Sequence, residues 1–129
     1  MSERNRNELE AMRILWDRGP LKPSEIQAEF SWPIENATLR SALRTLMDKG
    51  DVKRRRRGNA FYYQAKASRE GLLAGMVRQM AHVFSGGSCA NLIMQLIETE
   101  RLSAEEIEGL RRTAGRVAAQ KGPESDPET

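Results

Sequence analysis

The chain has 129 residues, of which 39% are hydrophobic and 30% charged, and its formal net charge is +3. This length suits one compact domain, or a small domain with an accessory element. The apolar core of such a small monomer is thin, so burying more surface against a partner would stabilise it. No apolar run approaches the roughly 18 residues of a membrane span, the N-terminus MSERNRNELE has no apolar signal segment, and the single cysteine excludes an internal disulfide framework. We therefore expect a cytoplasmic protein.

The positive charge is concentrated in one part of the chain. Residues 36–66 contain nine Lys or Arg against two Asp or Glu, whereas residues 67–129 contain seven against nine. A basic block beside a weakly acidic one predicts that the first part meets a polyanion and that the second has another task.

Three helices are predicted before residue 50. The first spans 7–18 and ends at a Gly-Pro pair, and a short second helix spans 23–30. The third spans about 35–49 and has a continuous apolar stripe. The stripe consists of Leu39, Ala42, Leu43, Leu46 and Met47.

The pattern changes from helical to alternating over residues 52–65, where Arg57-Gly58-Asn59 forms a turn between two extended runs. This pattern predicts a β-hairpin. Three helices followed by a hairpin are the elements of a winged helix-turn-helix.

The second half of the chain is predicted to be helical, over 69–84, over 89–99 and from Ser103 onward, where Ser103 and Glu106 fit a capping box. Three short helices cannot enclose the apolar surface they carry, so we expect two chains to pool it in a dimer. The residues expected in the dimer interface are Leu72, Met76, Met80, Phe84, Leu92, Ile93, Leu96, Ile97, Ile107, Leu110 and Val117.

The expected fold class is α+β and mostly α. We expect a winged helix-turn-helix DNA-binding domain over 1–66 and an all-α dimerisation region over 67–118. We expect residues 119–129 to be a disordered tail, because residues 121–129 are polar and contain two prolines.

The polar side of the 35–49 helix carries side chains suited to a DNA major groove, because Arg pairs with guanine and Ser or Thr bonds bases and phosphates. The candidate groove-reading residues are Thr38, Arg40, Ser41, Arg44 and Thr45. A solvated back of an ordinary amphipathic helix would show a similar pattern.

Five consecutive cations precede the hairpin turn, namely Lys53, Arg54, Arg55, Arg56 and Arg57. Alternate residues of a strand point to opposite faces, so both faces of the hairpin become basic, as suits a wing on a phosphate backbone or in a minor groove. Charges that blunt a sheet edge are the alternative, but one or two suffice for that purpose. Tyr62 is a candidate for a phosphate hydrogen bond or for packing.

Nothing in the sequence indicates an enzyme. His82 and Cys89 are the single residues of their types, both lie in predicted helices, and two ligands are too few for a structural zinc site. Gly86-Gly87 ends a helix and is not a phosphate-binding motif. We expect no cofactor and no metal.

Three segments resemble the penicillinase repressor family, which includes the methicillin-resistance and copper-responsive repressors. They are ELEAMRILWDRGPLKPSEI, NATLRSALRTLMDKG and the hairpin ending in AFYYQ, and the run VFSGGSCANLIMQLIETERLSAEEIEGLRR resembles the family's dimerisation region. The resemblance covers about residues 7–116. It implies a homodimer that represses genes by occluding polymerase on a palindromic operator, with residues 38–45 reading the groove.

The resemblance also implies possible signals. In resistance-type members a membrane sensor-protease system triggers cleavage in the second C-terminal helix, and the Asn-Phe bond of those members aligns with Gln95-Leu96. Copper-responsive members carry a C-terminal cysteine cluster, where this chain has only Cys89.

Two functions of other classes fit part of the sequence. One is a non-specific nucleic-acid or RNA-binding module that uses the basic hairpin alone. The other is a protein whose apolar C-terminal helices bind a different protein. A defined duplex footprint and the association state of the chain would separate these functions from a dimeric repressor.

Overall fold

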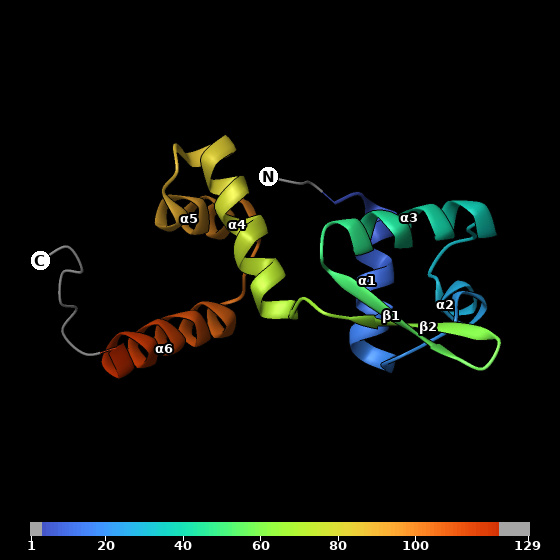
Figure 1. Ribbon diagram of the computed structural model, residues 1–129. Coiled ribbons are helices and arrows are strands. Elements are labelled where there is room, and N and C mark those ends of the chain that lie inside the picture. The colour runs from blue at the N-terminus through green and yellow to red at the C-terminus, as the bar shows by residue number, and fades with distance from the viewer. Residues whose placement is uncertain (1–3, 122–129) are drawn as a thin grey trace, which may run out of the picture. The chain divides into compact units, whose positions relative to one another are not determined.

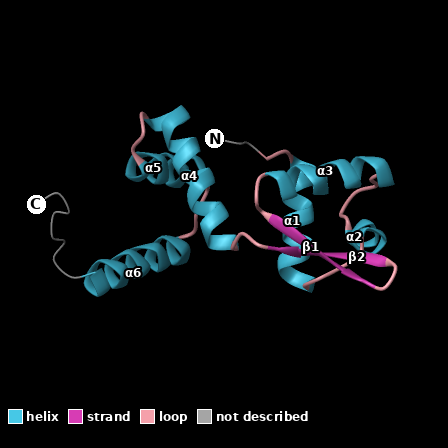
Figure 2. Ribbon diagram, in the orientation of Figure 1, coloured by secondary structure: helices cyan, strands magenta, loops and turns pink. Residues whose placement is uncertain are grey.

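The computed structural model describes residues 4–121, which form six helices and one two-stranded antiparallel sheet (Figures 1 and 2). The elements are α1 (Arg6–Arg18), α2 (Pro23–Glu29), α3 (Asn36–Asp48), β1 (Val52–Arg57), β2 (Ala60–Ala65), α4 (Arg69–Ser85), α5 (Cys89–Thr99) and α6 (Ala104–Lys121). The mostly helical fold class with a small hairpin is confirmed.

The chain divides into two compact units, Met1–Met76 and Val77–Thr129. This division lies ten residues beyond the boundary expected at residue 66, because the first half of α4 packs on the first unit: Leu72 is 7% exposed and Met76 contacts the same core. Helix α6 continues to Lys121, three residues beyond the expected helical region. The remainder of the expected tail lies outside the described residues.

The core of the first unit is formed by the apolar faces of its helices, which pack against the inner face of the hairpin. The third helix buries Leu39, Ala42, Leu43 and Leu46, as its stripe predicts. The other buried members are Ala11, Met12, Ile14, Leu15, Ile26, Val52, Tyr63 and Leu72. On the opposite side of α3, Thr38, Ser41 and Arg44 remain exposed.

The first helix is closed at its start by a capping box that the sequence analysis missed. The Asn5 side chain accepts from the Glu8 amide at 2.8 Å, and the Glu8 carboxylate accepts from the Asn5 amide at 3.3 Å. Lys49 Nζ lies 3.0 Å from the same Glu8 carboxylate, which ties the end of α3 to the start of α1.

The turn between α2 and α3 is fastened to α1 by hydrogen bonds. The Glu10 carboxylate accepts from the Ser31 amide at 2.9 Å and from the Ser31 hydroxyl at 2.7 Å. Trp32 Nε1 donates to Asn7 Oδ1 at 2.9 Å. Because both partners lie on α1, these bonds fix where α3 begins.

The hairpin gains a third partner outside its own two strands. Leu21, just before α2, pairs with Tyr63 of β2 through two backbone hydrogen bonds of 3.0 and 2.7 Å. Asp51 is 5% exposed, and its carboxylate accepts a hydrogen bond from Arg4 Nε at 2.8 Å. The hairpin is therefore held at its base by the N-terminal segment and by the segment before α2.

Helices α4 to α6 are capped as their sequences predict. The Gly87 amide donates to the Ala81 carbonyl at 2.9 Å, which closes the end of α4. Ser103 and Glu106 exchange backbone-to-side-chain bonds of 2.9 and 3.0 Å, so the predicted capping box is confirmed. None of the helices among residues 4–121 has the length and apolar character that crossing a membrane requires.

Replacement of Glu10 tests the fastening of the α2–α3 turn. Hydrogen bonds from Arg13 and then Ser31 lower the pKa of Glu10 from 4.5 to about 2. A lowered carboxyl pKa stabilises the fold fully above pH 4.5, and this contribution is lost as the pH falls toward 2. Glu10→Gln should therefore lower the free energy of unfolding at pH 7 by about 1–3 kcal/mol and flatten its decline below pH 4.5.

Urea unfolding followed by tryptophan fluorescence across this pH range measures both effects. Glu29→Gln is the matched control, since Glu29 pairs with Arg18 on the exposed surface, and a surface pair contributes about 0–1 kcal/mol. Equal stability of Glu10→Gln and the wild type at pH 7 would show that the Glu10 bonds do not stabilise the turn.

Candidate nucleic-acid interface

Helix α3 presents a polar surface opposite its buried stripe. The side chains of Thr38, Arg40, Ser41 and Arg44 are exposed, and Thr45 is half-buried. The sequence-predicted groove-reading residues therefore share one accessible side of a single helix. Such a side is the part of a helix-turn-helix that enters a major groove.

Two hollows flank α3, one on each side. The first has a volume of about 350 Å³ and lies between α3 and the start of α1; its lining is Asn5, Asn7, Glu8, Ala37, Thr38, Ser41, Ala42 and Thr45. The second, about 330 Å³, lies between α2, α3 and the hairpin; its lining is Lys22, Pro23, Ser24, Asn36, Arg40, Asn59, Ala60, Phe61 and Tyr63.

The hollows add candidate residues that the sequence analysis missed. Lys22 and Ser24 at the start of α2 and Asn59 at the hairpin turn line the same hollow as Arg40 of α3. Arg40 Nε donates to Asn36 Oδ1 at 2.7 Å, which orients its guanidinium along the start of the helix. The residues that line this hollow come from α2, α3 and the hairpin, so no local sequence pattern connects them.

The five cations of β1 are divided between the two faces of the hairpin. Arg54 pairs across the sheet with Tyr63, and Arg56 pairs with Phe61. Tyr63 is buried in the core, so this is the inner face. Lys53, Arg55 and Arg57 alternate onto the outer face, which they share with Ala60, Tyr62 and Gln64.

Ring contacts accompany the cations on both faces. The Arg54 guanidinium carbon lies 4.0 Å from the centroid of the Phe61 ring, and that of Arg57 lies 5.1 Å from the Tyr62 ring. Tyr62 is half-buried, and its ring packs against Arg57 of the same hairpin.

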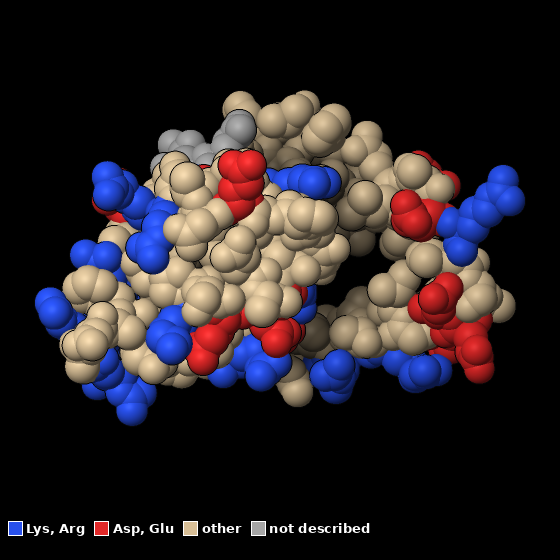
Figure 3. Space-filling view, turned by 90° about the vertical axis from the view of Figure 1, so that its right-hand side faces the viewer, with Lys and Arg blue, Asp and Glu red and all other residues tan. Residues whose placement is uncertain are grey.

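The charge of the hairpin is not neutralised within the described part of the chain. None of the ion pairs among residues 4–121 involves a cation of β1, whereas Arg13, Arg18 and Arg69 each pair with a carboxylate. On the face shown in the space-filling view, basic side chains project at many points, and acidic ones gather in small separate groups (Figure 3). The hairpin cations are thus available to an anionic partner.

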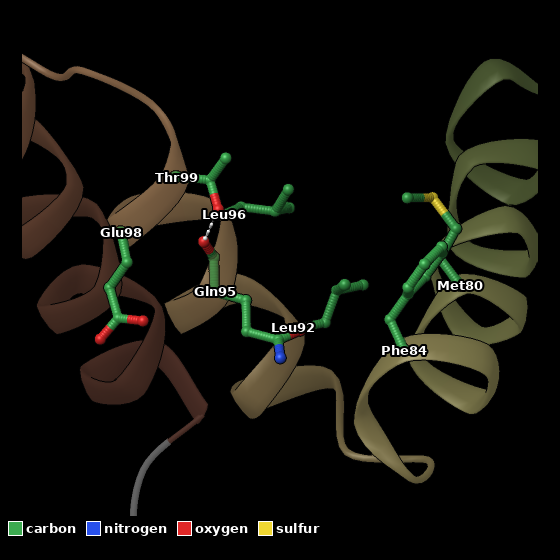
Figure 4. A pocket seen from close by; sticks show the side chains of 7 residues that line it. All are labelled: Met80, Phe84, Leu92, Gln95, Leu96, Glu98 and Thr99. Carbon is green, nitrogen blue, oxygen red and sulfur yellow. Dashed lines mark hydrogen bonds between the residues drawn. The ribbon is translucent and has the colours of Figure 1, made fainter.

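The second unit contains an apolar pocket of about 350 Å³ between α4 and α5 (Figure 4). Its apolar lining is Met80, Phe84, Leu92 and Leu96, and its polar edge is Gln95, Glu98 and Thr99. The Gln95-Leu96 bond lies inside α5, and the Gln95 carbonyl accepts from the Thr99 hydroxyl at 2.7 Å.

The residues expected at the dimer interface occupy different environments. Leu72 and Met76 pack on the core of the first unit, and Leu92 is 4% exposed. The exposed members are Met80, Phe84, Ile93, Leu96, Ile97, Ile107, Leu110 and Val117.

The remaining residues of chemical interest are dispersed. His82 is exposed and Cys89 is half-buried. Within residues 4–121, no three His, Cys, Asp or Glu side chains are grouped as metal ligands would be.

Three helices, a basic two-stranded wing and an exposed polar side on α3 define a winged-helix DNA-binding regulator. The fold is shared with solved structures. One is described as a "probable transcriptional regulator" from Pseudomonas aeruginosa, with 19% identity, a TM-score of 0.50, and coverage of 88% of this chain and 78% of that one. Another is the YusO protein of Bacillus subtilis, with 16% identity, a TM-score of 0.51, and coverage of 90% and 75%.

The family follows from the sequence comparison. The penicillinase repressor family model matches residues 5–115, so the chain belongs to this family of transcriptional repressors, which is a class of DNA-binding regulators and not of enzymes. The chain is 24% identical over 107 residues to the penicillinase repressor of Bacillus licheniformis, which covers 80% of this chain and 82% of that protein. The resemblance in the sequence analysis is confirmed.

Removal of the outer-face cations tests whether the wing contacts phosphates. Each phosphate contact contributes roughly 0.9 to the slope of log affinity against log salt concentration. Replacing Lys53, Arg55 and Arg57 together by alanine should weaken binding to all DNA duplexes and reduce this slope by up to about 3 units. Fluorescence anisotropy titrations at several salt concentrations measure the slope.

The matched control removes three arginines of α6, Arg111, Arg112 and Arg116, which lowers the net charge of the chain equally. If contacts at the wing are responsible, the control keeps the wild-type slope. Equal slopes for both triple variants would mean that only overall charge matters.

Proposed function

We propose that the chain acts as a homodimer that binds a palindromic DNA operator and represses transcription there. The observation that carries this proposal is the combination, in one winged-helix unit, of the exposed side of α3 with five wing cations that have no carboxylate partners among residues 4–121. We assign base contacts to Thr38, Ser41, Arg44 and Thr45. We assign backbone contacts to Arg40 and the wing.

The exposed apolar surface of the second unit supports dimerisation. Every large apolar side chain that is strongly exposed among residues 4–121 lies in α4, α5 or α6. Val83 and Phe84 are each 64% exposed, and Ile93 is 51% exposed. Exposed apolar side chains in this number are typical of an interface and not of a monomer in water. A second copy of the chain is the occupant expected from a repressor family, because a two-fold axis matches two half-sites.

A proteolytic signal is the release mechanism we propose, at or near Gln95-Leu96. The bond lies within an intact helical turn of α5, so a protease needs local unwinding of α5 before cleavage. Cleavage there would separate Leu92 from Leu96, which line one pocket. The dimer surface would lose its continuity, and the operator would be released.

Arg44→Ala tests the groove-reading assignment. If Arg44 pairs with a base, the variant should lose about 1–3 kcal/mol on the operator and relax the preference at one position in each half-site. Selection of bound duplexes from a random-sequence pool, followed by titration on the selected duplex and on a mixed-sequence one, measures both. Arg18→Ala, an exposed arginine at the end of α1, is the control. Equal weakening on both duplexes would assign Arg44 to phosphate.

Leu96→Asp tests whether the second unit supplies the dimer interface while the first unit contacts DNA. Leu96 is 45% exposed in the single chain, and a lone carboxylate buried in an interface costs several kcal/mol. The variant should be monomeric, keep a folded first unit, and lose more affinity on the operator than on mixed-sequence DNA.

Sedimentation, unfolding and gel shift on one sample measure these properties. Asn91→Asp introduces the same side chain on the opposite, polar side of α5 and should remain dimeric. A dimeric Leu96→Asp, or a monomer that binds the palindrome as tightly as the wild type, contradicts the assignment. A wild-type chain that binds single-stranded RNA more tightly than any duplex would favour the RNA-binding alternative.

A further inference from the structure

Phe61 occupies a central place on the inner face of the wing. It lies on β2, packs against the core of the first unit, and lines the hollow between α2, α3 and the hairpin. Guanidinium groups of two arginines lie near its ring: Arg54 at 4.0 Å and Arg56 at 5.7 Å from the centroid. The ring is thus fixed by the core and is itself in contact with two cations.

The ring and two hydrogen bonds restrict both arginines. Arg54 Nη1 donates to Tyr63 Oη at 3.2 Å, and Arg56 Nε donates to the Gly58 carbonyl at 3.2 Å. Two like charges on alternate residues of one strand repel each other, and the negative face of an aromatic ring attracts both. The acceptors are neutral, so the side chains lose mobility while their charges stay unneutralised.

Arg55, on the outer face of the same strand, provides a contrast. Within residues 4–121 the Arg55 side chain has neither a ring contact nor a hydrogen bond, although its neighbours on β1 carry the same charge. Ordering a mobile arginine when a partner binds costs free energy, and an arginine that is already ordered avoids that cost. The inner pair is therefore better prepared to bind an anion than Arg55.

We propose that Phe61 is a positioning residue for DNA binding, which holds Arg54 and Arg56 in place to contact phosphates at the hollow beside α3. This inference rests on the proposed binding of duplex DNA and adds a residue that touches no DNA itself. A recognition helix in the major groove has a phosphate backbone along its flank. The hollow between α3 and the wing lies on such a flank. Phe61, whose ring both guanidinium groups contact, lines this hollow together with Lys22 and Arg40.

A double-mutant cycle tests the proposal with a duplex selected by the wild-type chain from random-sequence DNA. Phe61→Leu removes the ring and keeps an apolar side chain. It should weaken binding about tenfold in the wild-type background, where it releases both arginines. In the Arg54→Ala/Arg56→Ala background, the same substitution should change the affinity less than twofold. Phe61→Tyr keeps the ring and should retain wild-type affinity.

The matched background is Arg55→Ala/Arg57→Ala, which removes the same charge from the other face. There Phe61→Leu should still cost about tenfold. An equal cost in all backgrounds overturns the proposal, because Phe61 would then act through the fold or through its own contact. Urea unfolding of each variant identifies a loss of fold. A wild-type chain that binds no duplex overturns the proposed function itself, and this inference with it.

Discussion

The position of Tyr63 is the constraint on which the wing depends. Its side chain is buried in the core, and its backbone is paired on one side with Arg54 and on the other with Leu21. A short hairpin alone is marginally stable in water. The core contact and the added pairing give this one a fixed base, from which a run of repelling cations can extend. Without that base, the charges on β1 would favour an unfolded segment.

The sequence predicted the helices because their signals are local. The stripe of α3 repeats along one face, and the cap at Ser103 depends on residues three apart, so both can be recognised without tertiary information. The pairing of Leu21 was missed because one bridging residue shows no alternating pattern. The bonds from Ser31 to Glu10 were missed for a similar reason, since the partners lie 21 positions apart.

The sequence was enough to predict which residue types form the candidate interface, but not how their side chains are arranged in space. A run of five cations identified the wing, but the sequence did not show that Phe61 contacts only those on one face. Leu72 illustrates a related limit. Its helical spacing indicates burial, yet periodicity does not tell which unit supplies the partner, and the structure places it on the winged-helix core. Assigning a buried residue to an interface needs the fold.

The exposed apolar side chains of α4 to α6 have a consequence for gene dosage. If a second copy covers them, the active species is a dimer, whose abundance at low expression rises with the square of the chain concentration. Halving the number of intact chains would then lower the DNA-bound population about fourfold. A switch of this kind responds steeply to partial removal of its regulator, without cooperativity between separate binding sites.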